Sequence, residues 1–155
     1  VEQDSRKGYW HITREWQGGD TLNLTFPMPV RRVYGNPLVR HVAGKVAIQR
    51  GPLVYCLEQA DNGESLHNLW LPTDAPFTTF EGKGLFSHKI LIQAPGYRYE
   101  QSNPEQQPLW HYDSAPAKRQ PQTLTFIPWF SWANRGEGEM RIWVNEEKHC
   151  HPEVG

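Results

Sequence analysis

Residues 128–140, PWFSWANRGEGEM, gather more chemically capable side chains than any other part of the sequence. Trp129 and Trp132 could stack against sugar rings, because exposed aromatic faces are common on binding surfaces. Arg135 could donate hydrogen bonds to hydroxyl groups through its planar guanidinium, and Asn134 lies in the turn beside it. These four residues therefore predict either a carbohydrate-binding surface or a contact with a neighbouring domain. We favour the second hypothesis, or burial in a core, because β-sandwich cores also bury Trp.

Glu137 and Glu139 raise the question of hydrolytic chemistry, since most glycoside hydrolases use two carboxyl groups about 5 to 10 Å apart. Both glutamates have glycine neighbours in a predicted loop. Nothing near them in the sequence would position an acid and a base. We expect them to be solvated, or to pair with Arg135 or Arg141, and we predict no catalytic residue in this chain.

The two cysteines, Cys56 and Cys150, show neither a disulfide framework nor a metal-binding pattern. Cys56 lies in an apolar stretch without His, Cys or acidic residues at ligand spacing, so we expect a buried, inert thiol. His149 and His151 flank Cys150, but adjacent residues rarely complete a tetrahedral site by themselves. We predict no metal site and no cofactor in this chain.

Length and charge exclude some classes of partner. The 155 residues allow one domain, or one domain with a piece of a neighbour. With 16 basic and 17 acidic residues, the net charge of -1 favours neither nucleic acid nor an anionic membrane as partner. No apolar run is long enough to cross a bilayer. The sequence begins at Val1 without Met, so a missing N-terminal portion could hold a signal and the localisation stays open.

Residues 45–58, KVAIQRGPLVYCLE, predict two apolar strands. Residues 46–50 alternate as a half-buried strand does. Residues 53–57 are apolar on both faces, which is typical of a central strand covered on two sides. Gly51 and Pro52, between the strands, fit either a bend that carries the chain from one sheet to another or a plain hairpin loop.

The rest of the sequence predicts an all-β fold, because seven Trp, six Tyr, six Phe, 13 Gly and 13 Pro favour strands and turns. Residues 9–16 and 21–26 are predicted to pair as a hairpin through the turn at 17–20, followed by a connector at 30–36. Further strands are predicted at 66–71, 77–80, 84–93, 123–127 and 140–145. Residues 97–122 are predicted to be a long polar loop.

About nine short strands at this spacing predict a jelly-roll-like β-sandwich. We predict that residues 1–33 finish a preceding β-sandwich, that residues 34–146 form a C-terminal β-sandwich, and that residues 147–155 are a tail.

Three segments carry a resemblance to a known family: REWQGGDTLNLTFPMPVRRVYGNP, then KVAIQRGPLVYCLE followed by Asp61 and Asn62, and FIPWFSWANRGEGEMRIWV. In this order they resemble the C-terminal region of glycoside hydrolase family 127, from about Tyr9 to Val144. The first segment resembles the part of the family in which one β-sandwich ends and the last begins. Residues 73–122 do not match.

The resemblance implies a parent enzyme of the retaining β-L-arabinofuranosidase type. In that family a zinc-bound cysteine thiolate is the nucleophile and a glutamate is the general acid/base, both on an N-terminal (α/α)6 barrel that this chain does not contain. Zinc lowers the pKa of a thiol and orients it for attack. None of these residues is carried over to this chain.

Two hypotheses of different class follow. In the leading one the chain is the non-catalytic C-terminal part of such a hydrolase, in a bacterial cytoplasm or periplasm. Its partners are then the N-terminal catalytic domain of the same protein and, in the dimeric version of this hypothesis, a second copy. The alternative is a free-standing carbohydrate-binding module. A reading frame that continues upstream into a helical domain would favour the first hypothesis.

Overall fold

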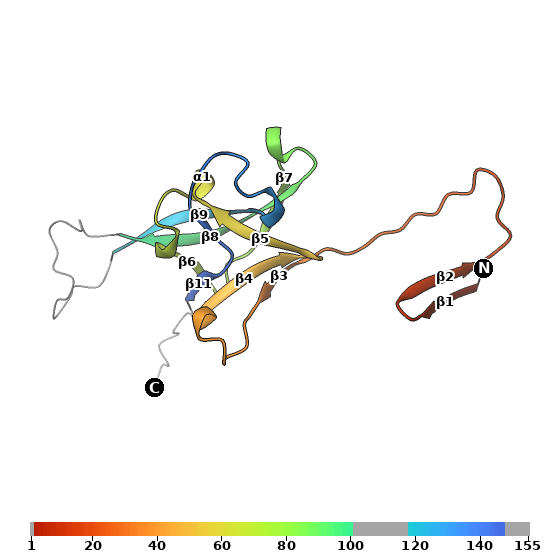
Figure 1. Ribbon diagram of the computed structural model, residues 1–155, viewed down its shortest axis with the longest axis horizontal. Helices are drawn as coiled ribbons and strands as arrows, with labels where there is room; N and C mark the ends of the chain where they lie inside the picture. Colours follow the sequence, from red (N-terminus) through yellow and green to blue (C-terminus); the bar gives the residue numbers. More distant parts are fainter. Residues whose placement is uncertain (1, 101–117, 148–155) are drawn as a thin grey trace.

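The computed structural model describes residues 2–100 and 118–147, and the all-β prediction is confirmed (Figure 1). The strands are β1 (Glu2–Arg6), β2 (Tyr9–Thr13), β3 (Val30–Val33), β4 (Lys45–Arg50), β5 (Leu53–Glu58), β6 (Leu69–Pro72), β7 (Thr78–Glu81), β8 (Ile90–Tyr99), β9 (Arg119–Pro128), β10 (Met140–Arg141) and β11 (Val144–Glu147). The short helical pieces are α1 (Gln59–Asn62) and the 3₁₀ turns η1 (Arg40–Val42), η2 (Leu66–Asn68), η3 (Gly84–Phe86) and η4 (Trp129–Ser131).

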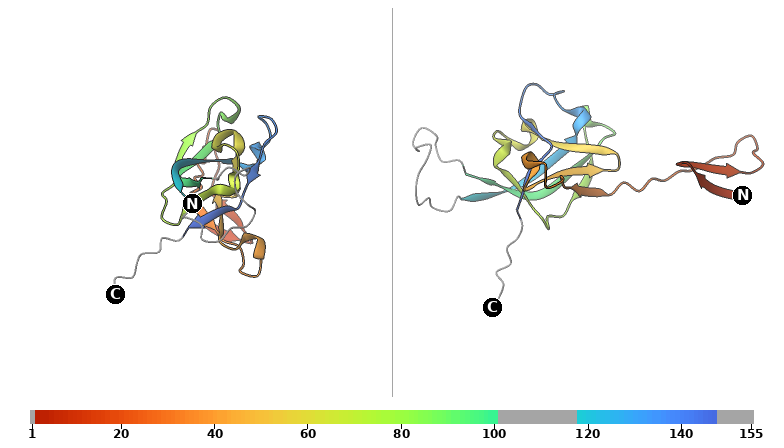
Figure 2. Two further views of the ribbon diagram at one scale, coloured as in Figure 1. Left: turned by 90° about the vertical axis from the view of Figure 1, so that its left-hand side faces the viewer. Right: turned by 60° about the horizontal axis from the view of Figure 1, so that its bottom comes forward.

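Six strands close into a barrel (Figures 1 and 2). The order around it is β4, β5, β9, β8, β6 and β11, and β11 pairs again with β4. All of these pairings are antiparallel except that of β11 with β6. The predicted jelly-roll sandwich is not confirmed, because the ring of hydrogen-bonded strands leaves no gap that would divide it into two stacked sheets.

The turn at Gly51 and Pro52 is a plain hairpin loop, so of the two alternatives the hairpin loop is correct and the bend between sheets is wrong. Arg50 pairs with Leu53, which leaves Gly51 and Pro52 as the two loop residues. Gly51 has a φ of +55°. A positive φ at the first loop position followed by the fixed negative φ of proline is the pattern of a type II′ turn. This turn lets β4 and β5 stay paired.

Strand β5 is buried on both faces from Tyr55 to Leu57, as predicted, whereas Val54 in the same predicted stretch is 40% exposed. Tyr55 and Leu57 face the barrel interior. The interior core also includes Val46, Ile48, Leu66, Leu69, Leu71, Ala75, Ile92, Ala94, Leu124, Phe126 and Val144. Cys56 faces the opposite side and belongs to a second cluster with Phe86, Leu91 and Ile127. The predicted burial of the Cys56 thiol is confirmed.

Strand β8 departs most from its prediction. The expected strand at 84–93 begins as η3 and becomes extended only at Ile90, and it then continues to Tyr99 through Pro95, where an end was predicted. Strand β7 pairs with residues 90–93 of β8 and β6 pairs with residues 97–98. No strand of the described residues pairs with that edge at Pro95, so the missing N–H of proline can face it.

Two other predicted strands are divided. Residues 66–71 start as η2 before β6, and residues 140–145 are split between β10 and β11. The predicted strands at 77–80 and 123–127 correspond to β7 and to part of β9. The long polar loop is shorter than predicted, because β8 and β9 extend into it. Residues 101–117, its middle part, lie outside the described residues.

The N-terminal segment lies apart from the barrel (Figures 1 and 2). Its predicted hairpin is wrong: β2 pairs with β1 rather than with residues 21–26. Lys7 and Gly8 form the turn, with φ values of 51° and 80°. Two positive φ angles in succession are the pattern of a type I′ turn. Residues 14–29 contain no strand, although Gln17 and Asp20 form the predicted turn, with the Asp20 amide donating to the Gln17 carbonyl at 3.1 Å.

Strand β3 occupies the first part of the predicted connector at 30–36. It pairs with β4 over residues 47–50. Arg32 Nη1 also donates to Glu146 Oε1 of β11 at 2.8 Å. Residues 30–33 therefore pack with the barrel rather than with the segment that precedes them.

Candidate functional site

The aromatic turn is our name for residues 128–134, which begin at the last residue of β9. Pro128, at the end of β9, pairs with Tyr55 of β5. The 3₁₀ turn η4 then closes with the Trp132 amide donating to the Trp129 carbonyl at 3.0 Å. The side chains of Trp129, Phe130 and Trp132 are 49%, 58% and 40% exposed. The surface turn thus carries three large aromatic side chains within four residues of sequence, and none of them lies in the core.

Arg135 is engaged in an ion-pair cluster instead of facing solvent. Its Nε donates to Glu58 Oε2 at 3.0 Å, its Nη1 donates to Asp61 Oδ1 at 2.7 Å, and its Nη2 contacts both carboxylates. The guanidinium carbon lies 4.7 Å from the centre of the Phe86 ring, a cation–π distance. Hydrogen bonding to Asp61 raises the pKa of Arg135 against the opposing effect of burial, and bonding to Glu58 raises it further. Four of the five N–H donors of Arg135 are therefore already used inside the protein.

Glu58 anchors the aromatic turn from below. Its side chain is only 4% exposed, and its Oε1 accepts a hydrogen bond from the Ala133 amide at 3.1 Å. Ala133 has a φ of 64°, a conformation that costs energy for a residue with a Cβ. Asn134 Nδ2 donates to the Ser131 carbonyl at 3.0 Å. These bonds hold the backbone of the turn in one conformation, and the exposed Trp side chains extend from this rigid backbone.

The sequence-predicted site is therefore assembled only in part. Trp129 and Trp132 are on the surface, Asn134 is a bracing residue of the turn, and Arg135 points to Glu58 and Asp61. A hollow of about 410 Å³ lies beside Trp132, lined also by Ala133, Gly136, Glu137 and Gly138. No sequence pattern links Glu58 and Asp61 to Arg135, because 77 and 74 residues separate them from it.

Neither Glu137 nor Glu139 forms a salt bridge with Arg135, whose carboxylate partners are Glu58 and Asp61. Glu139 accepts hydrogen bonds from the backbone amides of Ser65 at 3.1 Å and Leu66 at 2.9 Å. The bond from Leu66 lowers the pKa of Glu139, and the bond from Ser65 adds to the effect. Glu137 lines the open hollow. Glu139 therefore joins β10 to the start of η2, which is a structural role.

Cys56 is poorly suited to nucleophilic chemistry. Burial, followed by the nearby charges of Glu58 and Asp61, raises the pKa of the thiol to about 12. The thiolate is the reactive form, so such a shift disfavours attack. No group of three His, Cys, Asp or Glu side chains within residues 2–100 and 118–147 could hold a metal ion. His149, Cys150 and His151 lie outside the described residues.

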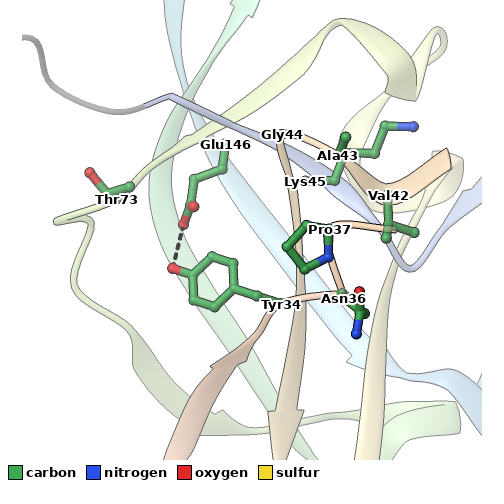
Figure 3. Close-up of a pocket in the computed structure, with 10 residues that line it drawn as sticks. Tyr34, Asn36, Pro37, Val42, Ala43, Gly44, Lys45, Thr73 and Glu146 are labelled. Atoms are coloured by element: carbon green, nitrogen blue, oxygen red, sulfur yellow. Dashed lines mark hydrogen bonds between the residues drawn. The ribbon is translucent and has the colours of Figure 1, made fainter. Parts of the chain in front are cut away.

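A second hollow, here called the Tyr34 cavity, lies where the connection from β3 to β4 passes β11 (Figure 3). Its volume is about 540 Å³, and its lining includes Tyr34, Pro37, Val42, Gly44, Thr73 and Glu146. Tyr34 Oη donates to Glu146 Oε1 at 3.0 Å. Bonding to Glu146 and burial both raise the pKa of Tyr34, burial having the larger effect. Nothing in the sequence marked these residues as neighbours.

Comparison with known proteins gives a consistent result. A sequence model of the glycoside hydrolase family 127 C-terminal domain matches residues 30–145. The curated non-reducing end β-L-arabinofuranosidase of Bifidobacterium longum subsp. longum is 40% identical over 129 residues, covering 80% of this chain and 20% of that protein.

No helix in the described parts of the chain is long and apolar enough to cross a membrane.

Solved structures show the same relationship. A family 127 β-L-arabinofuranosidase from Geobacillus stearothermophilus T6 superposes with a TM-score of 0.70 at 43% identity, covering 79% of this chain and 19% of that one. A second family 127 β-arabinofuranosidase gives a TM-score of 0.77 at 33% identity, covering 95% and 22%. The chain thus spans about a fifth of the length of these relatives.

Proposed function

Because the chain belongs to glycoside hydrolase family 127 as its C-terminal domain, we propose that it is a non-catalytic part of a β-L-arabinofuranosidase-like enzyme. In this proposal it supports an N-terminal catalytic domain of the same protein, and the zinc and the catalytic residues belong to that domain. Association into a dimer is a further proposal that rests on the resemblance alone.

The observation that carries the support role is the aromatic turn. Its Trp129 and Trp132 rings are exposed, while the buried Glu58 and the paired Arg135 fix the turn behind them. Exposed aromatic rings on a rigid support are typical of a protein contact. A sugar site would need polar donors beside the rings, and Arg135, the predicted donor, is already occupied.

The N-terminal segment supports the same proposal. Large apolar side chains of residues 9–26 are exposed, among them Trp10, Trp16, Leu22, Leu24 and Phe26. A two-stranded hairpin such as β1 and β2 is marginal by itself. We propose that residues 2–29 complete a preceding β-sandwich. The pairing of β3 with β4 favours a boundary before Val30 instead of at Val33.

An activity measurement tests the non-catalytic role. Purified chain 1–155 should not hydrolyse an aryl β-L-arabinofuranoside and should hold no stoichiometric zinc by elemental analysis. Cys56→Ser should behave in the same way, because its thiol is buried and protonated. Turnover by the unsubstituted chain that Cys56→Ser abolishes would contradict the proposal.

Trp132→Ala tests the contact, measured both in chain 1–155 and in the same domain joined to its catalytic domain. If the turn supports that domain, the joined protein should lose roughly 3 kcal/mol, the scale for truncating a buried aromatic. The isolated chain, in which Trp132 is 40% exposed, should lose much less. Saturable binding of arabinan oligosaccharides to the isolated chain, removed by Trp132→Ala at unchanged melting temperature, would instead favour the carbohydrate-binding alternative.

A further inference from the structure

The Tyr34 cavity contains a carboxylate group whose hydrogen-bonding capacity the fold uses only in part. The Glu146 side chain is only 7% exposed, yet Glu146 lines the cavity. Its Oε1 accepts from Arg32 Nη1 at 2.8 Å and from Tyr34 Oη at 3.0 Å. Its Oε2 accepts no hydrogen bond from residues 2–100 and 118–147. Oε2 is not one of the fully buried side-chain atoms that lack a partner, so it can be reached from the cavity and can accept a hydrogen bond from a ligand.

The charge of this carboxylate is already balanced. Arg32 has a side chain 14% exposed, and it also donates through Nη2 to the carbonyls of Pro72 at 2.8 Å and Ala75 at 3.1 Å. Its guanidinium lies 4.9 Å from the centre of the Phe77 ring. Arg32 is therefore held in place, and it fixes Glu146 in one orientation. A second cation would find its charge already compensated, whereas a neutral hydroxyl group could still donate to Glu146.

Most of the cavity wall is apolar, and Asn36, Lys45 and Thr73 are its polar part beside Glu146. Figure 3 shows the Tyr34 ring beside Pro37, with the Glu146 carboxylate at the Tyr34 hydroxyl. The wall that carries Val42 packs tightly, because a Cβ at Gly35 would lie 2.2 Å from Val42 Cγ2. Tyr34, on the other wall, is 58% exposed, so its ring is accessible to a ligand. Such a ring can cover the C–H face of a ligand while the carboxylate accepts from its hydroxyl groups.

We propose that the Tyr34 cavity binds one neutral sugar residue, with its C–H face on Tyr34 and a hydroxyl group donating to Glu146 Oε2. The volume of about 540 Å³ lies within the range of small-ligand sites. This site is separate from the aromatic turn, and it does not depend on whether the domain supports a catalytic partner.

The test is a titration of ¹⁵N-labelled chain 1–155 with L-arabinose, followed by amide chemical shifts. We expect saturation with a dissociation constant on the order of 1 to 10 mM, as befits a ligand of this size in an open site. The shifts should centre on Tyr34, Gly44 and Glu146. Tyr34→Ala should weaken binding about tenfold by removing the stacking surface, whereas Tyr34→Phe should keep most of it.

Trp132→Ala, in the other hollow, is the matched control and should leave the affinity unchanged. If Tyr34→Ala loses its fold, the location of the shifts in the unsubstituted chain decides the question. Absence of saturation, or shifts centred on Trp132, would overturn the proposal. Methylguanidinium chloride that binds the Tyr34 cavity more tightly than L-arabinose would show a cation site and would overturn the proposed ligand class.

Discussion

The barrel and the N-terminal segment contain the same kind of sequence pattern with opposite outcomes. In β9, Leu124 and Phe126 alternate with polar residues and are fully buried. In residues 21–26, Leu22, Leu24 and Phe26 alternate equally well, but they form no strand and remain exposed. Strand β9 pairs with β8 and β5, whereas residues 21–26 pair with nothing among the described residues. An alternating pattern therefore specifies a face to be buried, and the partner decides whether a strand forms.

The largest expected change in the free energy of unfolding comes from removing one phenylalanine ring from the barrel, compared with removing one from the N-terminal segment. Phe126→Ala should destabilise the chain by about 4 kcal/mol, because it removes a fully buried ring and leaves a cavity. Phe26→Ala should change the stability by less than about 0.5 kcal/mol, since Phe26 is 74% exposed. Urea unfolding of both variants measures the difference. Equal losses would mean that residues 21–26 pack in the isolated chain, and the comparison would fail.

Arginine ion pairs give the next effect. Arg135→Met leaves the buried Glu58 carboxylate without its cation, and we expect a loss of about 3 kcal/mol. Arg14→Met breaks the exposed pair between Arg14 and Asp20, and it should cost less than about 1 kcal/mol. Thermal unfolding compares the two. The double variant Glu58→Gln with Arg135→Met is the control, and it should recover part of the lost stability because the Glu58 charge, the more deeply buried of the two carboxylates, is removed.

The smallest effect concerns pH. The folded pKa of Glu139 is lowered by hydrogen bonds from Leu66 and Ser65, so its contribution is complete above the ordinary glutamate pKa of about 4.3. That contribution is lost as the pH falls through the lowered pKa. Glu139→Gln should therefore show a shallower loss of stability on acidification below about pH 5. Glu137→Gln should follow the unsubstituted chain. An identical pH profile for Glu139→Gln would contradict the assignment.

Local signals made the barrel hairpin predictable. Strands β4 and β5 lie within one residue of the predicted bounds, because their apolar pattern and the turn between them are contiguous in sequence. The N-terminal hairpin differs from its prediction for a local reason too: the chain has two turn signals there, and the strands pair across Lys7 and Gly8 instead of across residues 17–20. Closure of the barrel depends on β11 meeting both β4 and β6, which no short-range pattern records.

The candidate site shows the same limit. Trp129 and Trp132 were recognised by residue type, and their rings are exposed as a binding or contact surface requires. Arg135 was expected to be available to a ligand, but its true partners come from β5 and α1. The Tyr34 cavity joins residues more than a hundred positions apart. Side chains can be listed from a sequence, whereas their partners depend on the closed fold.

Hydrogen exchange on chain 1–155 tests most directly whether the chain is a C-terminal barrel preceded by a piece of another domain. Amide exchange should be slow at residues 53–57, because β5 pairs with β4 and β9 and is buried from Tyr55 to Leu57. It should be much faster across residues 9–26, because buried and paired segments open least often. Slow exchange throughout residues 9–26, equal to that of residues 53–57, would show that the N-terminal segment shares the barrel core and would contradict the account.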